Sequence, residues 1–108
     1  MTEEVEKADL TNLTEIDRTV HEPARLAIMS LLYVVDSADF TFIMNQTGLT
    51  WGNLSADISK LEDAAYVEVE KTFKGKRPNT VLKLTPQGRQ AFRDYVKRMK
   101  QVFQDFDG

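Results

Sequence analysis

The sequence contains no cysteine and a single histidine, His21. The lack of cysteine excludes a disulfide framework, a thiolate metal site and a thiol redox switch, and it permits a reducing compartment. No second histidine or cysteine can join His21, so the usual ligands of a transition-metal site are missing and no metal is expected. His21 is therefore interpreted as a hydrogen-bonded structural residue, with a general base or a metal ligand as the alternative.

Long apolar runs and catalytic motifs are also missing. No apolar stretch approaches the roughly 20 residues needed to span a bilayer. The N-terminus is acidic where a signal peptide would be basic, so the expected location is the cytoplasm. There is no Gly-rich phosphate loop and no nucleophile elbow, and the carboxylates are scattered along the chain. We therefore expect neither an enzyme nor a bound cofactor.

Charge of the two signs is segregated along the chain. The net charge of -3 over 108 residues at first argues against a nucleic-acid partner. However, residues 1–20 contain six acids and two bases, whereas residues 71–100 contain ten bases and one acid. Because local potential rather than net charge steers a polyanion, the second segment remains a candidate for DNA binding.

One predicted helix has an unusual outer face. At 42% hydrophobic residues the chain can form one domain with a modest core. Thr50 can cap a helix whose apolar residues, Leu54, Ile58 and Leu61, share one face. The other face carries small, neutral, hydrogen-bonding residues, where solubility alone would favour Glu and Lys. Such a face suits close approach to the DNA major groove, although a solvated face also carries some Ser and Asn.

After this helix, the spacing at which apolar residues recur changes from 3.6 to 2 residues, which predicts a β-hairpin. Val67, Val69 and, more loosely, Phe73 alternate with charged residues in the first strand, and residues 81–84 form the second. The loop between them, residues 74–79, carries three bases and no acid. This composition favours a clamp on the phosphate backbone of DNA. The alternative is an edge hairpin kept soluble by lysines.

Two more helices are predicted upstream. Residues 21–35 are apolar on more than one side, and Pro23 fits the first turn, which is typical of a central core helix. A short helix over residues 40–47 ends at Gly48, a residue suited to a left-handed stop. Followed by the helix that Thr50 caps, it predicts a helix-turn-helix.

Two stretches carry a resemblance to a known family: VHEPARLAIMSLL and GLTWGNLSADISKLEDAAYVEVEKTFKGKRPNTVLKLTPQGRQAF. They resemble the opening motif, reading helix, wing and following helix of the ArsR and MarR class of winged helix-turn-helix repressors. The closest likeness is to small stand-alone archaeal and bacterial regulators, and it covers roughly residues 16–103. The resemblance implies a homodimeric, sequence-specific transcription regulator, expected to be a repressor, with its reading helix in the major groove and its wing on the flanking backbone; the sequence itself does not decide between repression and activation.

The expected fold is α+β and mostly helical. Residues 1–15 are expected to be an acidic, partly helical segment, residues 16–85 the winged-helix core and residues 86–108 a dimerisation helix. The expected DNA-binding residues are Thr50, Trp51, Asn53, Ser55, Ser59, Lys60, Lys74, Lys76 and Arg77.

Two residues depart from the family pattern. Ala65 stands where Gly is usual before the first strand, so either a left-handed conformation there costs about 1 kcal/mol or the turn is built differently. Asp57 stands where relatives often have a basic residue or His. This acid weakens the expectation of phosphate contacts from the reading helix.

The last helix predicts a second copy of the chain as a partner. Thr85 can cap it and Pro86 fits its first position. Over residues 86–106 it would be about 31 Å long, which is more than the core can cover. We therefore expect a homodimer, with folding of the apolar stripe onto the chain's own core as the alternative. The expected interface residues are Leu10, Leu13, Phe92, Tyr95, Val96, Met99, Val102, Phe103 and Phe106.

Two functions from different classes therefore remain open. The first is a dimeric regulator that binds double-stranded DNA. The second is a winged helix that docks onto another protein without binding DNA, which would suit the acidic net charge and the acids on the reading helix. No membrane partner is expected, and the sequence names no operator, regulated gene or small-molecule effector.

Overall fold

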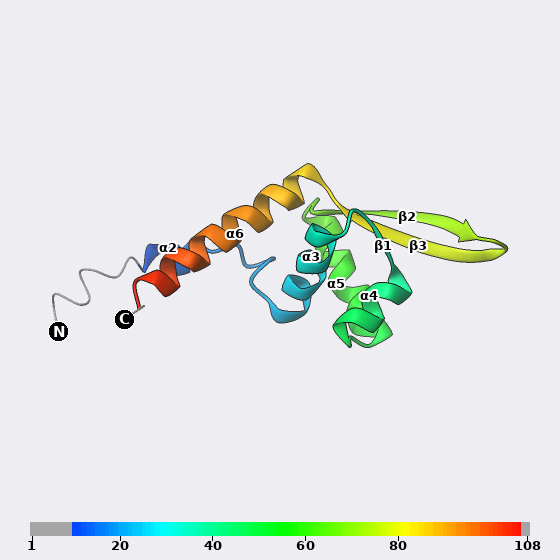
Figure 1. The fold of residues 1–108 in the computed structure, drawn as a ribbon, viewed down its shortest axis with the longest axis horizontal. Coiled ribbons are helices and arrows are strands. Elements are labelled where there is room, and N and C mark those ends of the chain that lie inside the picture. Colours follow the sequence, from blue (N-terminus) through cyan, green and yellow to red (C-terminus); the bar gives the residue numbers. More distant parts are fainter. Residues whose placement is uncertain (1–9, 107–108) are drawn as a thin grey trace.

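The computed structural model describes residues 10–106. Most of the predicted acidic N-terminal segment, residues 1–9, lies outside the described residues. The described elements run along the chain as drawn in Figure 1. They are α2 (Thr11–Thr14), α3 (Pro23–Val34), β1 (Ala38–Asp39), α4 (Phe40–Thr47), α5 (Trp51–Asp63), β2 (Val67–Lys74), β3 (Arg77–Leu84) and α6 (Pro86–Gln104). None of the helices in this part of the chain is long and apolar enough to cross a membrane.

The core lies where α3, α4 and α5 pack against the root of the sheet, which is the end of the β2–β3 hairpin farthest from its turn. α3 supplies Ile28, Met29 and Leu32 to this core, which confirms its prediction as the central helix. The predicted apolar face of α5 is also confirmed, because all three of its residues are buried. The largest fully buried side chains are Ile28, Met29, Leu32, Ile43, Leu54, Leu61, Leu82 and Val20.

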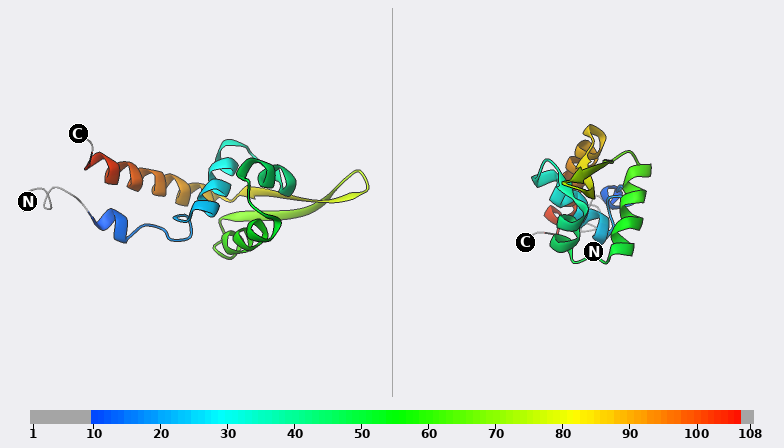
Figure 2. Two further views of the ribbon diagram at one scale, coloured as in Figure 1. Left: turned by 90° about the horizontal axis from the view of Figure 1, so that it is seen from below. Right: turned by 90° about the vertical axis from the view of Figure 1, so that its right-hand side faces the viewer.

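The helix-turn-helix is formed by α4 and α5. Gly48 follows α4 with a φ of 71°, the left-handed stop that the sequence predicted. Asp39 begins α4, because its Oδ1 accepts a hydrogen bond of 2.8 Å from the backbone N–H of Phe42. The turn therefore holds the N-terminus of α5 close to α4, on the outside of the domain (Figures 1 and 2).

The sheet has a third strand that the sequence reading missed. The strand order is β1-β3-β2, and both pairings are antiparallel. β1 consists only of Ala38 and Asp39, which pair with Leu82 and Val81. Two residues are too few to show an alternating pattern, so no sequence signal marks this strand.

The β2–β3 hairpin is longer than predicted. Of the predicted loop, residues 74–79, Lys74 belongs to β2 and residues 77–79 belong to β3, and the last cross-strand pair is Lys74 with Arg77. The turn is only Gly75 and Lys76, with Gly75 at a φ of 65°. Pro78 fits into β3 because β1 stops well short of it, so no neighbouring strand needs the missing N–H.

A compact corner joins α5, β2 and α6. Ala65 has a φ of 63°, so the chain takes the left-handed conformation rather than a different turn. The N–H of Ala65 donates to Glu62 O, and that of Tyr66 donates to Leu61 O, both at 2.9 Å. These bonds satisfy carbonyls at the end of α5. The hydroxyl of Thr85 also donates to Ala65 O at 2.6 Å.

The start of α6 is confirmed as predicted. Thr85 Oγ1 accepts a hydrogen bond of 2.9 Å from the N–H of Gly88, and Pro86 occupies the first turn. Gly88 packs directly on the corner, where an added Cβ would lie 2.1 Å from Tyr66 O. From this point α6 extends away from the wing, with α2 beside its far half (Figures 1 and 2).

Candidate nucleic-acid interface

α5 presents the predicted reading face to solvent. Thr50 is used as its cap, because Thr50 Oγ1 accepts a hydrogen bond of 3.2 Å from the N–H of Asn53. The remaining predicted base-reading side chains lie on the outer face. Those exposed are Trp51, Asn53, Ser59 and Lys60, and Ser55 is half-buried.

Trp51 is the largest side chain on this face. It is 66% exposed, and its ring lies 5.9 Å from that of Phe40 on α4, measured between centroids. Contact with Phe40 restricts the indole at the N-terminal end of α5. The indole is therefore held at the end of the reading helix and offers most of its surface to an incoming partner.

A groove separates α5 from the wing, the hairpin of β2 and β3. It has a volume of about 490 Å³ and is lined from both sides. α5 contributes Trp51, Ser55 and Ser59, and the hairpin contributes Lys71 and Pro78. The structure therefore brings predicted base-reading residues and the wing to one concavity.

The wing has an exposed, basic tip. Lys74, Lys76 and Arg77 are all exposed, as predicted. The only ion pair found for them among the described residues joins Lys74 Nζ to Asp39 Oδ2 at 4.0 Å. At this distance and with Lys74 largely exposed, the pair contributes little. The tip therefore keeps its positive charge available to phosphates.

Phe73 does not behave as the strand pattern predicted. The sequence placed it, loosely, on the half-buried side of β2, but its side chain is 70% exposed. The alternation holds for Val67, which is buried, and for Val69, which is half-buried. It fails at Phe73 because the hairpin has by then run past the helices that form the core (Figure 1).

Asp57, the acid that weakened the prediction of phosphate contacts, faces inward. Its Oδ1 accepts a hydrogen bond of 3.0 Å from Arg25 Nη1, and both side chains are only 13% exposed. The carboxylate is therefore neutralised by a cation of the same chain. Its charge detracts less from DNA binding than the sequence suggests.

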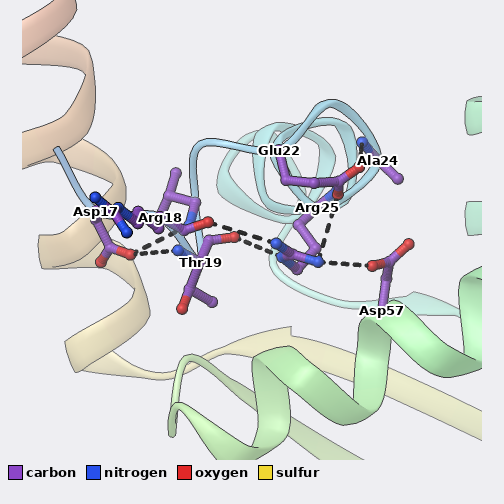
Figure 3. A network of polar contacts seen from close by, with 8 residues as sticks. Asp17, Arg18, Thr19, Glu22, Ala24, Arg25 and Asp57 are labelled. Atoms are coloured by element: carbon purple, nitrogen blue, oxygen red, sulfur yellow. Dashed lines mark hydrogen bonds and ion pairs between the residues drawn. The ribbon is translucent and has the colours of Figure 1, made fainter. Parts of the chain in front are cut away.

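Arg25 connects α5 to the segment before α3 (Figure 3). Besides Asp57, its guanidinium donates to Thr19 O at 2.7 Å and to Arg18 O at 3.4 Å. Sequence reasoning missed this residue, because Arg25 and Asp57 are 32 positions apart and no local spacing links them. The guanidinium fixes α5, the reading helix, against the loop between α2 and α3.

Glu22 lies at the end of this loop, directly before α3. Its carboxylate caps α3, accepting hydrogen bonds from the N–H groups of Arg25 at 2.8 Å and Ala24 at 3.1 Å. The bond from the Arg25 N–H is the main reason that the pKa of Glu22 lies below its usual value of 4.5. Glu22 therefore stays charged at neutral pH and holds the end of this loop that joins α3.

The predicted dimer residues separate into three sets by burial. Tyr95 and Val102 are already buried within the chain, whereas Phe92, Val96 and Met99 are half-buried. The exposed set is Leu10, Leu13, Phe103 and Phe106, of which the two phenylalanines are 64% and 68% exposed. The buried pair supports the fold of the chain itself, and the exposed set remains open for a partner.

His21 contacts the buried set. Its Nδ1 shares a hydrogen bond of 2.9 Å with the hydroxyl of Tyr95, which matches its interpretation as a structural residue. Burial raises the pKa of Tyr95, so this phenol stays protonated at neutral pH. Within residues 10–106, His, Asp and Glu form no cluster that could hold a metal ion.

A short helix, a turn, an exposed second helix and a basic antiparallel hairpin define a winged helix-turn-helix protein. Residues 24–103 match the family described as the winged helix DNA-binding domain, and the chain belongs to this family. It is a winged-helix DNA-binding transcriptional regulator, and its family is not enzymatic. The predicted fold and class are confirmed.

Similar proteins come from archaea and bacteria. The chain is 32% identical over 83 residues to an uncharacterized protein of Methanocaldococcus jannaschii, covering 77% of this chain and 90% of that protein. A transcriptional regulator homologue from Pyrococcus horikoshii OT3 has a TM-score of 0.85 at 31% identity, covering 91% of this chain and 99% of that one. A MarR-family regulator from Silicibacter pomeroyi, at 20% identity, shares the fold with a TM-score of 0.62, covering 90% and 63%.

Proposed function

We propose that the chain acts as a homodimer that binds a specific double-stranded DNA sequence and represses transcription. The observation that carries this proposal is the groove between α5 and the wing, which joins a hydrogen-bonding reading face to a basic hairpin. As a regulator of this kind, the protein acts on DNA in the cytoplasm.

Each half of the groove suits a different part of the duplex. Asn, Ser and Lys side chains on α5 can reach base edges or phosphates when the helix enters the major groove. Lys76 and Arg77 at the hairpin tip would meet the adjacent backbone, and the projection of the wing beyond the helices supports this role (Figure 2). Phosphate contacts supply affinity and register, and the α5 contacts supply sequence preference.

α6 provides the surface for two-fold pairing. Its 19 residues correspond to a length of about 28 Å; the exposed Phe103 lies in its last turn and the exposed Phe106 just beyond its end. Apolar side chains of this size stabilise a complex when a second copy covers them. Two-fold pairing would place two reading helices about 34 Å apart, the spacing of successive major-groove half-sites.

The DNA part of the proposal is tested by anisotropy titrations. The probe is the duplex that the wild-type protein selects from a random pool, measured beside a random duplex at several salt concentrations. The variant pair Lys76→Gln and Arg77→Gln should weaken binding about tenfold or more and reduce the salt slope by about two. Lys83→Gln is the control, because Lys83 lies near the hairpin root and pairs with Glu68 at 3.4 Å.

The outcomes separate the two candidate functions. Unchanged affinity in the double variant would refute the role of the wing. If the wild-type protein bound no duplex even at low salt, the protein-docking module would replace the regulator.

The homodimer is tested by sedimentation velocity. Phe103→Ser with Phe106→Ser should shift the protein from dimer to monomer without unfolding it, because neither side chain is in the core. Monomeric wild-type protein would contradict the pairing.

A further inference from the structure

The tip of the wing carries an exposed apolar pair. Phe73 of β2 and Pro78 of β3 lie directly opposite each other and form the second cross-strand pair from the turn. Phe73 is 70% exposed, and Pro78 is exposed too. A wing that needed only solubility and phosphate contact would place polar side chains here.

This pair lies on the side of the hairpin that faces the reading helix. Side chains alternate between the two faces of a strand, so Val69, Lys71 and Phe73 share one face of β2. Val69, Lys71 and Pro78 line the groove beside α5. Phe73, opposite Pro78, therefore continues this side of the hairpin towards the tip of the wing.

The basic residues around Phe73 and Pro78 indicate which kind of partner this apolar pair can bind. Lys74, Lys76 and Arg77 follow Phe73 within four positions, and Lys74 and Arg77 form the next cross-strand pair. A partner must therefore combine dense negative charge with apolar surface in a narrow space. The DNA minor groove does so, because phosphates line its edges and its base steps accept apolar wedges.

We propose that the wing tip enters the minor groove and that Phe73, supported by Pro78, acts as a wedge at a base step and bends the bound duplex. This inference rests on the proposed function and adds an architectural role to the wing. Inserted side chains of this type partly unstack a step and kink DNA by roughly 20–90°. Phe73 would also favour flexible pyrimidine–purine steps at positions that it does not read by hydrogen bonds.

The position of the wedge relative to α5 makes the proposal specific. The groove between α5 and the hairpin would receive one backbone strand, with α5 in the major groove and the tip in the neighbouring minor groove. The bend would therefore lie outside the bases that α5 contacts, once on each side of a two-fold complex.

The test compares three proteins on the duplex selected by the wild type. Phe73→Thr removes the wedge while keeping a good strand former, and Phe73→Leu keeps an apolar wedge of smaller size. Bending is measured by energy transfer between dyes at the duplex ends. Unstacking is measured by the fluorescence of 2-aminopurine placed at successive steps of the flanking minor groove.

The wild type should shorten the distance between the dyes and brighten 2-aminopurine at one flanking step. Phe73→Thr should lose both signals and bind about tenfold more weakly, with an unchanged salt slope because no phosphate contact is removed. Phe73→Leu should retain most of the bend.

Two results would overturn the inference. Tight, salt-sensitive wild-type binding without a bend would overturn the wedge alone and leave the proposed function intact. A bend that persists in Phe73→Thr would assign the bending to another part of the protein, and Phe73 to contact with a sugar or with another protein. If the wild type bound no duplex, the proposed function and the wedge would fail together.

Discussion

Replacement of Arg25 by Met should destabilise the protein far more than replacement of its partner, Asp57, by Asn. Arg25 makes several contacts at once, with Asp57 at 3.0 Å and Thr19 O at 2.7 Å. Methionine fills similar volume without donating a hydrogen bond. The change therefore leaves a carboxylate that is 13% exposed without its cation, together with an unpaired loop carbonyl.

The expected losses in unfolding free energy depend on which charged or polar groups each substitution leaves without a partner. Loss of one partner of a buried ion pair costs about 3–5 kcal/mol, and the slight exposure of this pair places Arg25→Met near about 3 kcal/mol. Asp57→Asn keeps a neutral acceptor and leaves Arg25 with its loop carbonyls and with the Glu22 carboxylate, 3.7 Å from Arg25 Nη1, so a loss of only about 1 kcal/mol is expected. The free energy of unfolding of the double variant should be about 1–2 kcal/mol higher than that of Arg25→Met, because no buried carboxylate then lacks its cation.

Urea unfolding followed by tryptophan fluorescence and circular dichroism measures these differences. Protein concentration must be equal for all variants, because dimerisation would contribute to stability. A loss of about 3 kcal/mol corresponds to a midpoint lower by about 2 M for a chain of this size. Equal losses for the two single variants, or no recovery in the double variant, would refute the reasoning.

Three further predictions concern the corner between α5, β2 and α6. Gly88→Ala should cost more than about 3 kcal/mol and lower the thermal midpoint by more than about 10 °C, because the new Cβ would lie 2.1 Å from Tyr66 O. Ala65→Gly should raise the urea midpoint, since it relieves about 1 kcal/mol at a φ of 63°. Burial and the hydrogen bond that the Tyr66 hydroxyl donates to Asp17 raise the pKa of Tyr66 to about 12. This contribution to stability is complete below pH 10 and is lost as pH rises towards 12, so Tyr66→Phe should flatten the alkaline fall in unfolding free energy.

Helices were predictable from the sequence because their signals are local. α4 begins and ends within the predicted limits, since Gly48 marks its end. Thr50 and Thr85 mark the starts of α5 and α6 by hydrogen bonds to residues three positions on. A capped segment with an apolar stripe needs no knowledge of distant residues.

Features that depend on distant partners were not predictable. β1 is two residues long and exists because β3 has a free edge to pair with it. The hairpin was predicted too short because residues 74–79 include Gly and Pro, which signal a loop. The cross-strand pairs within this stretch depend on the register of β2 against β3, which the local sequence does not reveal.

The candidate site was predicted in part for the same reason. Exposed residues of α5 and the basic tip could be assigned from their own positions. The orientation of Asp57 could not, because the cation that turns it inward comes from α3. Similarly, Tyr95 and Val102 fit an apolar stripe, and only the packing within the folded chain shows that they are covered.

The passage from the wing into α6 through one residue, Thr85, has a consequence for the DNA sequences that the protein can use. If two copies pair through α6, no tether separates the part that pairs from the part that touches DNA. Proteins whose DNA-binding units hang on long linkers accept half-sites at many separations. Here one separation would be accepted, and natural selection could change it only by altering how the two copies of α6 cross.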